Sequence, residues 1–527
     1  MKNIQKRTGT FFIVLLAVVT FWGCTEDFEE INQNPNFPEQ ASPELLLPGV
    51  IRQMAYNWGD QGWDEGFTVV QYGARLQFTS GDRYNWSPTN DPYFDAYDSM
   101  RDVENILRET KENPNLQNYY GVGLIVKSWI YSYLTDAYGA VPYTNATKGI
   151  SEGNITPEFT PQQEIYSGIL ADLKSANQIL TGMDNISGDI LYGGDVNKWR
   201  KFANSLRLRH LMRISNVDNQ TAVAGMNEIV NDPDTYPVFE GNEDNAAVQW
   251  NSDDPQPKFE TRSGSFDEVR LSLTLETRLK ELNDRRLIVY AQPTSASGEG
   301  IYSDNLDDYV GMPNGLDDAA ALAYSPSGNP AEAGSNYISR LGVLLTCRAC
   351  DEENASPTAS QTILMDYAEL QFILAEARER GFISLGEAGQ YYEKGIRASF
   401  GYYTDRIVAG GWNEIAANLQ SFDLDGYIAQ NDVVYAGSTA ERLEKIALQK
   451  WISLFYTGFE AWSDWRRTGM PEIVPGQDAA NNGQVPVRFL YPNEVKSTNN
   501  ANYQEAVNQI GGDDLNTRLW WDTTDSN

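Results

Sequence analysis

Residues 361–400 decide which fold class the sequence predicts. They read QTILMDYAELQFILAEARERGFISLGEAGQYYEKGIRASF. Apolar residues recur at helical spacing in both of its halves. This spacing predicts one helix over 361–380 and a second over 385–400. Only a few residues separate the two, so we expect a helical hairpin.

The residue types in this hairpin are typical of a known repeat. Ala388, Tyr392 and Gly395 occupy the Ala, Phe and Ala positions of the second helix of a tetratricopeptide unit, and Ala375 and Ala377 lie in the helix before it. Helical spacing recurs in other segments: 48–77, 95–111, 116–138, 161–180, 195–214 and 441–466. Two long polar stretches rich in turn residues, 232–265 and 291–361, predict loops. We therefore predict a mostly α fold of tetratricopeptide-like helical hairpin repeats with long irregular loops.

The helix expected over 195–214 carries an unusual number of basic residues for so acidic a chain. Lys198, Lys201, Arg209 and Arg213 lie among them, and we expect them to pair with neighbouring carboxylates. His210, the only histidine, lies on the apolar stripe of this helix and is expected in the core.

The first 23 residues predict a cleaved secretory signal peptide. The basic residues Lys2, Lys6 and Arg7 precede an apolar run that is too short to span a bilayer, which needs about 20 residues. Gly23 and Cys24 close this run in a way that resembles the lipobox of bacterial lipoproteins, in which the thiol is acylated and the chain is cut before it. We expect lipidation of Cys24; the alternative is an ordinary signal peptide that leaves a free thiol.

Residues 24–45 predict a tether that is acidic at first and then rich in Asn and Pro. The acidic patch after Cys24 resembles the export signal that sends some outer-membrane lipoproteins to the cell exterior; a solvated tether is the alternative. We therefore expect a lipid-anchored protein of the outer membrane that faces the exterior. The acidic residues are Glu26, Asp27, Glu29 and Glu30.

The composition excludes some classes of function. A formal net charge of −33 repels nucleic acid and anionic membrane surfaces. Only three cysteines occur, so disulfides do not hold the fold together. Cys347 and Cys350 lack the further Cys and His ligands of a zinc site and the setting of a redox motif. We expect a local disulfide or two thiols there, and leave the choice open.

Two motifs and the many acidic residues raise the alternative of an enzyme or a metal site. Residues 149–153, GISEG, fit the G-x-S-x-G pattern of serine hydrolases, but no strand is expected before them and the lone His210 is assigned to the core. Residues 423–426 match part of a calcium loop without its closing Glu, so a structural calcium stays open and no cofactor is expected. An acid pair of a glycoside hydrolase also stays open.

Seven motifs in order resemble the SusD/RagB family of cell-surface nutrient-binding lipoproteins. They are CTEDFEEINQNPN at 24–36, LTDAYGAVPYTNAT at 134–147, KWRKFANSLRLRHLMRI at 198–214, YVGMPNG at 309–315, ILMDYAELQFILAEA at 363–377, EAWSDWRRTGMP at 460–471 and VPVRFLYPNE at 485–494. The resemblance implies a single SusD-like domain over 46–527 with four tetratricopeptide-like units. It also implies a SusC-type TonB-dependent transporter as partner, an oligosaccharide or, in some members, a peptide as ligand, and no catalysis.

The loop TSGDRYNWSPTNDP, residues 79–92, is the expected ligand site. Sugars present apolar C–H faces and many hydroxyl groups, which suit exposed aromatic rings with Asn, Asp and Arg around them. The candidates are Arg83, Tyr84, Asn85 and Trp86 in this loop, with Trp250 and Tyr309 from the other polar loops. The alternative is that these aromatic rings fix the loops to the helices.

Overall fold

The computed structural model describes residues 41–523, apart from 64, 183–184, 258–267, 295–299, 325–337 and 346–352. The expected signal peptide, Cys24 and most of the tether lie outside the described residues, as do Cys347 and Cys350. The last three positions assigned to the tether, residues 43–45, already belong to a helix.

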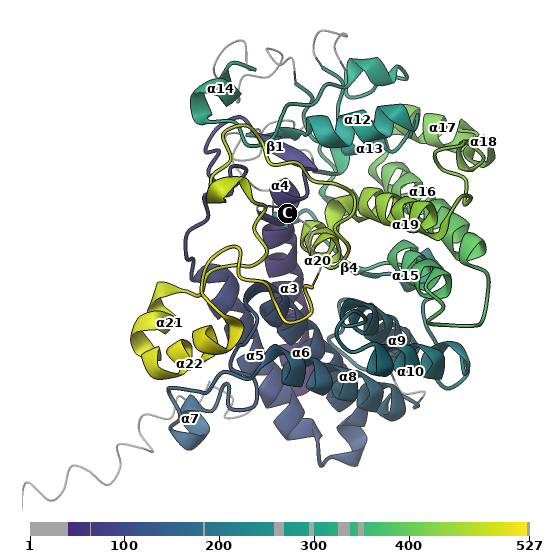
Figure 1. Ribbon diagram of the computed structural model, residues 1–527. Helices are drawn as coiled ribbons and strands as arrows, with labels where there is room; N and C mark the ends of the chain where they lie inside the picture. Colours follow the sequence, from purple (N-terminus) through teal and green to yellow (C-terminus); the bar gives the residue numbers. More distant parts are fainter. Residues whose placement is uncertain are drawn as a thin grey trace, which may run out of the picture. The chain divides into compact units, whose positions relative to one another are not determined.

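The long helix α3 (Pro43–Trp63) lies in the middle of the unit that begins at Pro43 (Figure 1). It packs against α5 (Asp91–Thr110), α6 (Gln117–Tyr138) and α20 (Gly458–Thr468). The other α-helices are α4 (Glu65–Val69), α7 (Gly149–Glu152), α8 (Gln162–Ile179), α9 (Val196–Arg213), α10 (Asn219–Val230), α12 (Leu273–Glu281), α13 (Leu287–Tyr290), α14 (Asp318–Leu322), α15 (Tyr367–Glu379), α16 (Ala388–Gly410), α17 (Asn413–Ser421), α18 (Leu424–Ile428), α19 (Thr439–Ser453), α21 (Asn493–Thr498) and α22 (Asn500–Ile510).

In the described ranges, four short strands form two antiparallel pairs. Strand β1 (Gly73–Arg75) pairs with β3 (Val269–Leu271), and β2 (Ala246–Gln249) pairs with β4 (Gln361–Met365). The helices predicted over 48–77 and 361–380 are therefore wrong over 73–75 and 361–365. Backbone pairing with β2 and β3 overrides the helical spacing there, and Asp366 begins α15 by accepting a hydrogen bond from the amide of Glu369 at 2.7 Å.

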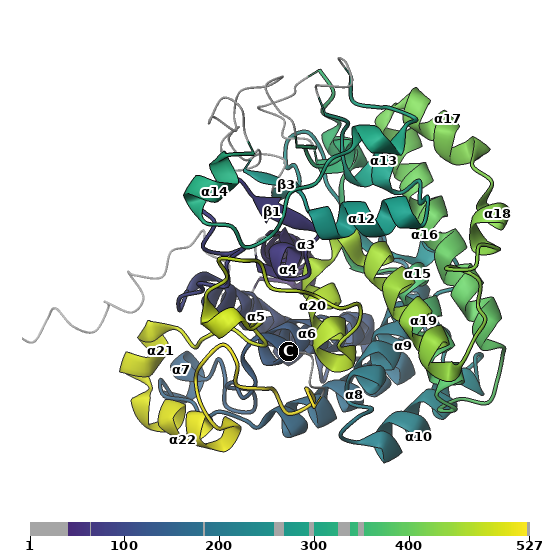
Figure 2. The ribbon, with the colours of Figure 1, turned by 45° about the horizontal axis from the view of Figure 1, so that its top comes forward.

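The hairpin predicted from residues 361–400 is confirmed as α15 packed on α16. Gly395 is required at this contact, because a Cβ there would lie 2.8 Å from the ring of Phe372. Phe372 and Tyr392 meet edge to face at 6.2 Å. Neighbouring pairs such as α6 with α8 and α8 with α9 also pack side by side (Figures 1 and 2).

The single helix predicted over 441–466 is wrong in the middle. The chain leaves α19 through the 3₁₀ turn η8 (Leu454–Tyr456), and Thr457 has φ −128° and ψ 52° before α20 begins. The break lets α20 approach α3 closely, since a Cβ on Gly458 would lie 2.4 Å from the carbonyl oxygen of Gly62.

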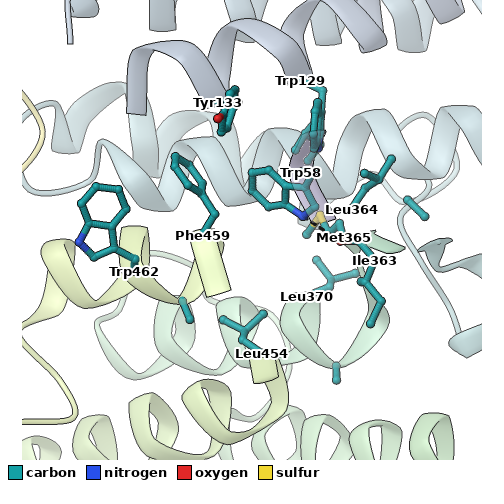
Figure 3. Packing of buried hydrophobic residues seen from close by; sticks show 14 of the residues in the cluster. Trp58, Trp129, Tyr133, Ile363, Leu364, Met365, Leu370, Leu454, Phe459 and Trp462 are labelled. Atoms are coloured by element: carbon teal, nitrogen blue, oxygen red, sulfur yellow. Dashed lines mark hydrogen bonds between the residues drawn. The ribbon is translucent and has the colours of Figure 1, made fainter. Parts of the chain in front are cut away.

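Aromatic rings dominate the core around α3. Trp58 meets Trp129 edge to face at 4.9 Å and lies 5.2 Å from Phe459, with Tyr133 beside them (Figure 3). The indole Nε1 of Trp58 donates to the carbonyl oxygen of Ile363 at 2.9 Å. Helices from both ends of the chain thus share one aromatic cluster.

The basic face of α9 is mostly neutralised by carboxylates, as expected. Lys201 pairs with Asp244 at 2.8 Å, Arg209 with Glu369, and Arg213 with Glu460 at 2.6 Å. Lys198 differs: its Nζ donates to the backbone carbonyl of Glu243 at 2.6 Å, and it forms no salt bridge with any described carboxylate.

His210 is buried in this helix, which confirms its place in the core. Burial lowers its pKa well below the ordinary value, and the nearby cations Arg209 and Arg213 lower it further. The imidazole is therefore neutral.

Candidate functional site

The predicted binding loop is held in place by a buried carboxylate. Asp82 is 1% exposed and accepts hydrogen bonds from Asn314 Nδ2 at 2.6 Å, the amide of Gly315 at 3.0 Å and the amide of Arg75 at 3.2 Å. Burial raises its pKa to about 6, although these bonds oppose the shift. The loop is thus fixed to β1 and to the 314–315 turn.

Three of the six candidate ligand-binding residues are not exposed. Tyr84, Trp250 and Tyr309 are each no more than 2% exposed, so the expectation that they offer open ring faces is wrong in this structure. Trp250 Nε1 donates to Thr362 Oγ1 at 2.9 Å, and the Tyr309 hydroxyl donates to the Ser303 carbonyl at 3.0 Å. Because the polar groups of Trp250 and Tyr309 find internal partners, these two rings pack into the core instead of facing solvent.

The other three candidates keep access to solvent. Trp86 is half-buried: its Nε1 donates to the Gly81 carbonyl at 2.8 Å, and its ring meets Trp462 and Phe489 edge to face. Arg83 Nε donates to the Asp478 carbonyl at 2.9 Å, whereas Asn85 is exposed.

The structure does not bring the six residues into one site. Trp250 lies against Arg52 and β4, and Tyr309 lies against the 303–308 segment. The consecutive residues 83–86 instead pack between the 478–480 segment and α20.

A cavity of about 260 Å³ opens where this loop enters α5. Tyr93, Phe94 and Tyr97 supply its aromatic wall, with Asp98 and Arg101 from the next turn. The opposite wall comes from segment 142–157, which contains α7, and from α21 with Asn499. Figure 2 shows α7 near α21. Asn499 Nδ2 donates to the Pro157 carbonyl at 2.7 Å and so ties the two parts of this wall together.

The cavity combines apolar and polar groups. The Tyr97 hydroxyl donates to the Pro142 carbonyl at 2.6 Å, and burial raises the pKa of Tyr93 and Tyr97 above the ordinary value, so both phenols stay neutral. Asp98 and Arg101 form a 3.1 Å ion pair that is more than 60% exposed. An aromatic wall with carboxylate, guanidinium and amide groups at its edge suits a sugar ring.

The aromatic residues of this cavity come directly after the loop that the sequence singled out. Phe94, Tyr97 and Arg101 follow the spacing i, i+3 and i+7, which places them on one face of α5. That pattern was available from the sequence, but it is also the pattern of an ordinary core stripe.

Two motifs that suggested an enzyme or a metal site lie at short helices. Turns, rather than a strand, precede α7 at the GISEG motif. Asp423 caps α18 by accepting from the amide of Gly426 at 2.9 Å. Among the described residues, no group of three His, Cys, Asp or Glu side chains could hold a metal ion. Across the same ranges, no helix is long and apolar enough to cross a membrane.

Stacked helical hairpins with an aromatic cavity among their loops define an α-helical repeat protein. The chain belongs to the SusD-like family described as "Starch-binding associating with outer membrane", whose family model matches residues 35–492. The predicted family and the mostly helical SusD-like fold are confirmed.

Solved structures agree with this assignment. A SusD homologue from Bacteroides fragilis is 28% identical, with a TM-score of 0.75 over 92% of this chain and 99% of that chain. A chitin-binding protein is 27% identical, with a TM-score of 0.73 over 92% and 100%. A chitin-binding SusD homologue from Flavobacterium johnsoniae, 24% identical with a TM-score of 0.73 over 91% and 99%, shares the fold. No curated protein matches the chain.

Proposed function

We propose that this protein binds an oligosaccharide nutrient at the cell surface and delivers it, unchanged, to a SusC-type TonB-dependent transporter. The observation that carries the proposal is the cavity of Tyr93, Phe94 and Tyr97, with Asp98 and Arg101 at its edge. The chitin-binding character of two similar structures supports a glycan as the ligand.

Binding divides between stacking and hydrogen bonding. Phe94 and Tyr97 receive the apolar face of a sugar ring, while Asp98, Arg101 and Asn154 bind hydroxyl groups. Arg83, Asn85 and Trp86 extend the site along the loop before α5. Tyr84, Trp250 and Tyr309 act as packing residues that position the loops.

The proposal also places the protein at the outer membrane. An acylated Cys24 holds the protein in the outer membrane, and the acidic patch behind it directs the protein to the exterior. A lipid chain contributes about 0.8 kcal/mol for each buried methylene, so several chains give a lasting anchor.

Calorimetry with chitin and starch oligosaccharides tests the binding site. Phe94→Ala should weaken binding about thirtyfold, because truncating an anchoring ring costs about 2 kcal/mol. Arg101→Ala, at an exposed position, should weaken binding about tenfold without a change in melting temperature. Leu385→Ala is the control, because Leu385 is 52% exposed and does not line the cavity.

Unchanged affinity in both Phe94→Ala and Arg101→Ala, in a protein that binds the oligosaccharide, would remove the site from this cavity. Chromatography of the oligosaccharide after incubation separates a binder from a hydrolase: cleavage by the purified protein would contradict the proposal.

A further inference from the structure

A second cavity, of about 500 Å³, lies on a different part of the helical stack. The first turn of α9, the 3₁₀ turn η2 (Asn242–Asp244), the ends of β2 and β4, and α16 surround it. Its volume falls in the range of small-molecule sites, roughly 300–1000 Å³. Unlike the first cavity, it is lined mostly by polar and charged side chains.

Four charged side chains around this cavity have no partner of opposite charge among the residues that the structure describes. They are Lys198 of α9, Glu243 of η2, and Asp405 and Arg406 of α16. Within the described residues none of them forms a salt bridge: Lys198 Nζ donates to a backbone carbonyl, and Arg406 Nη1 donates to Gln249 Oε1 at 3.2 Å. Lys201, one turn along α9, pairs with both Glu240 and Asp244.

The adjacent charges of α16 do not neutralise each other. Asp405 and Arg406 are consecutive in a helix, so their side chains diverge instead of facing each other. The cavity therefore carries two cations and two carboxylates that no charged group in the described part of the chain pairs.

Amide and hydroxyl groups fill the wall between these charges. The Tyr402 hydroxyl donates to Gln361 Oε1 at 3.1 Å, and Asn242 Nδ2 donates to the Ala398 carbonyl at 2.9 Å. Asn245, which is 9% exposed, accepts from the amide of Tyr367 through Oδ1, while its Nδ2 has no hydrogen-bond partner. Leaving a buried amide N–H unpaired costs free energy. A bound ligand toward which the Asn245 side chain turns would supply the missing acceptor.

We infer that this cavity binds a small zwitterion, a free amino acid or a dipeptide. The carboxylate of the ligand pairs with Lys198 and Arg406, and its ammonium group pairs with Glu243 and Asp405. A neutral sugar leaves all four charges without partners, and a polyanion is repelled by the two carboxylates. This inference concerns a site separate from the aromatic cavity and does not rest on the glycan proposal.

Calorimetry of the mature protein with alanyl-alanine tests the inference against three related probes. N-acetyl-alanyl-alanine lacks the ammonium group, alanyl-alanine amide lacks the carboxylate, and maltose lacks both charges. We expect binding of alanyl-alanine and at least a tenfold weaker affinity for the N-acetylated and the amidated dipeptide, while maltose should not compete with alanyl-alanine for this cavity. Competition by maltose that persists in Phe94→Ala would overturn the inference, as would no binding of alanyl-alanine at millimolar concentration.

Variants locate the binding. Lys198→Ala and Asp405→Asn should each weaken alanyl-alanine binding at least tenfold at unchanged melting temperature, and Arg406→Ala should do the same. Lys445→Ala is the matched control, because Lys445 Nζ also donates only to backbone carbonyls, those of Asn431 and Val434, and does not line the cavity. Phe94→Ala should leave dipeptide binding unchanged. Full affinity in both Lys198→Ala and Asp405→Asn would place the dipeptide elsewhere and contradict the inference.

Discussion

Asp366 caps a helix, although its burial makes the charged form of its carboxylate unfavourable. It begins α15 as an N-cap, yet it is only 5% exposed. Burial, together with the neighbouring carboxylate of Glu369, raises its pKa to about 7. The helix therefore begins at a group that loses its proton near neutral pH.

This raised pKa makes part of the stability depend on pH. The folded state holds the proton of Asp366 more tightly than the unfolded state, so the stabilisation is complete below about pH 4 and is lost as the pH rises through about 7. Asp366→Asn keeps the cap and cannot ionise. As the pH rises from 4 to 8, the unfolding free energy of this variant should increase by roughly 1 to 3 kcal/mol relative to that of the wild type. Urea titration at each pH measures the difference. Parallel pH profiles of the two proteins would contradict the assignment.

The aromatic residues show which core positions can be predicted from the sequence and which cannot. The core positions of Trp58 and Tyr72 were predictable, because both lie in a segment with helical spacing. Tyr84, Trp250 and Tyr309 lie in polar loops without helical spacing, and the partner of Trp250, Thr362, is far away in the sequence. A tyrosine hydroxyl or indole N–H can be satisfied by a loop or by a ligand, and the sequence contains no signal that distinguishes the two.

The contact between α15 and α16 sets the spacing of the hairpin that residues 361–400 predicted. Phe372 is fully buried and its ring lies where a side chain at Gly395 would begin. The tetratricopeptide pattern requires a small residue at this position for that reason.

Two glycine substitutions test this contact. Gly395→Ala should destabilise the protein by about 1 to 3 kcal/mol, because Phe372 has no room to move. Gly49→Ala, also inside a helix, meets nothing within 4 Å and should stabilise the protein by roughly 0.5 to 1 kcal/mol. Both values follow from thermal or urea unfolding. An unchanged unfolding free energy in Gly395→Ala would show that the two helices can move apart at little cost.

Elements were predictable where local spacing and tertiary pairing agree, and not where they compete. The helices at 91–110, 117–138 and 196–213 follow their apolar spacing. Residues 361–365 have the same spacing but pair with β2, and Thr457 breaks a periodic segment so that α20 can reach α3. Both departures depend on partners more than a hundred residues away.

Across the whole molecule, buried ion pairs join helices that are distant in sequence. Arg213 of α9 pairs with Asp136 of α6 at 3.4 Å and with Glu460 of α20 at 2.6 Å. Arg467 of α20 pairs with Glu376 of α15 at 2.6 Å. Removing one member leaves an unpaired buried charge, so these pairs fix the arrangement of the helices more than they stabilise it.

The proposed lipid anchor depends on one residue outside the described ranges, Cys24. Cys24→Ala should release the protein from outer membranes into the soluble fraction, because the acyl chains can no longer be attached. Fractionation followed by immunoblotting measures the change. Retention of the variant with the membrane at the wild-type level would contradict the lipid anchor.

The central position of α3 has a consequence for the order in which the chain can fold. Synthesis makes α3 early, but Trp58 finds its acceptor 305 residues later, at Ile363, and its neighbour Phe459 later still. Until those segments exist, the apolar face of α3 has no permanent partner. The protein should therefore fold slowly and late, with a long interval in which an unfinished chain can aggregate.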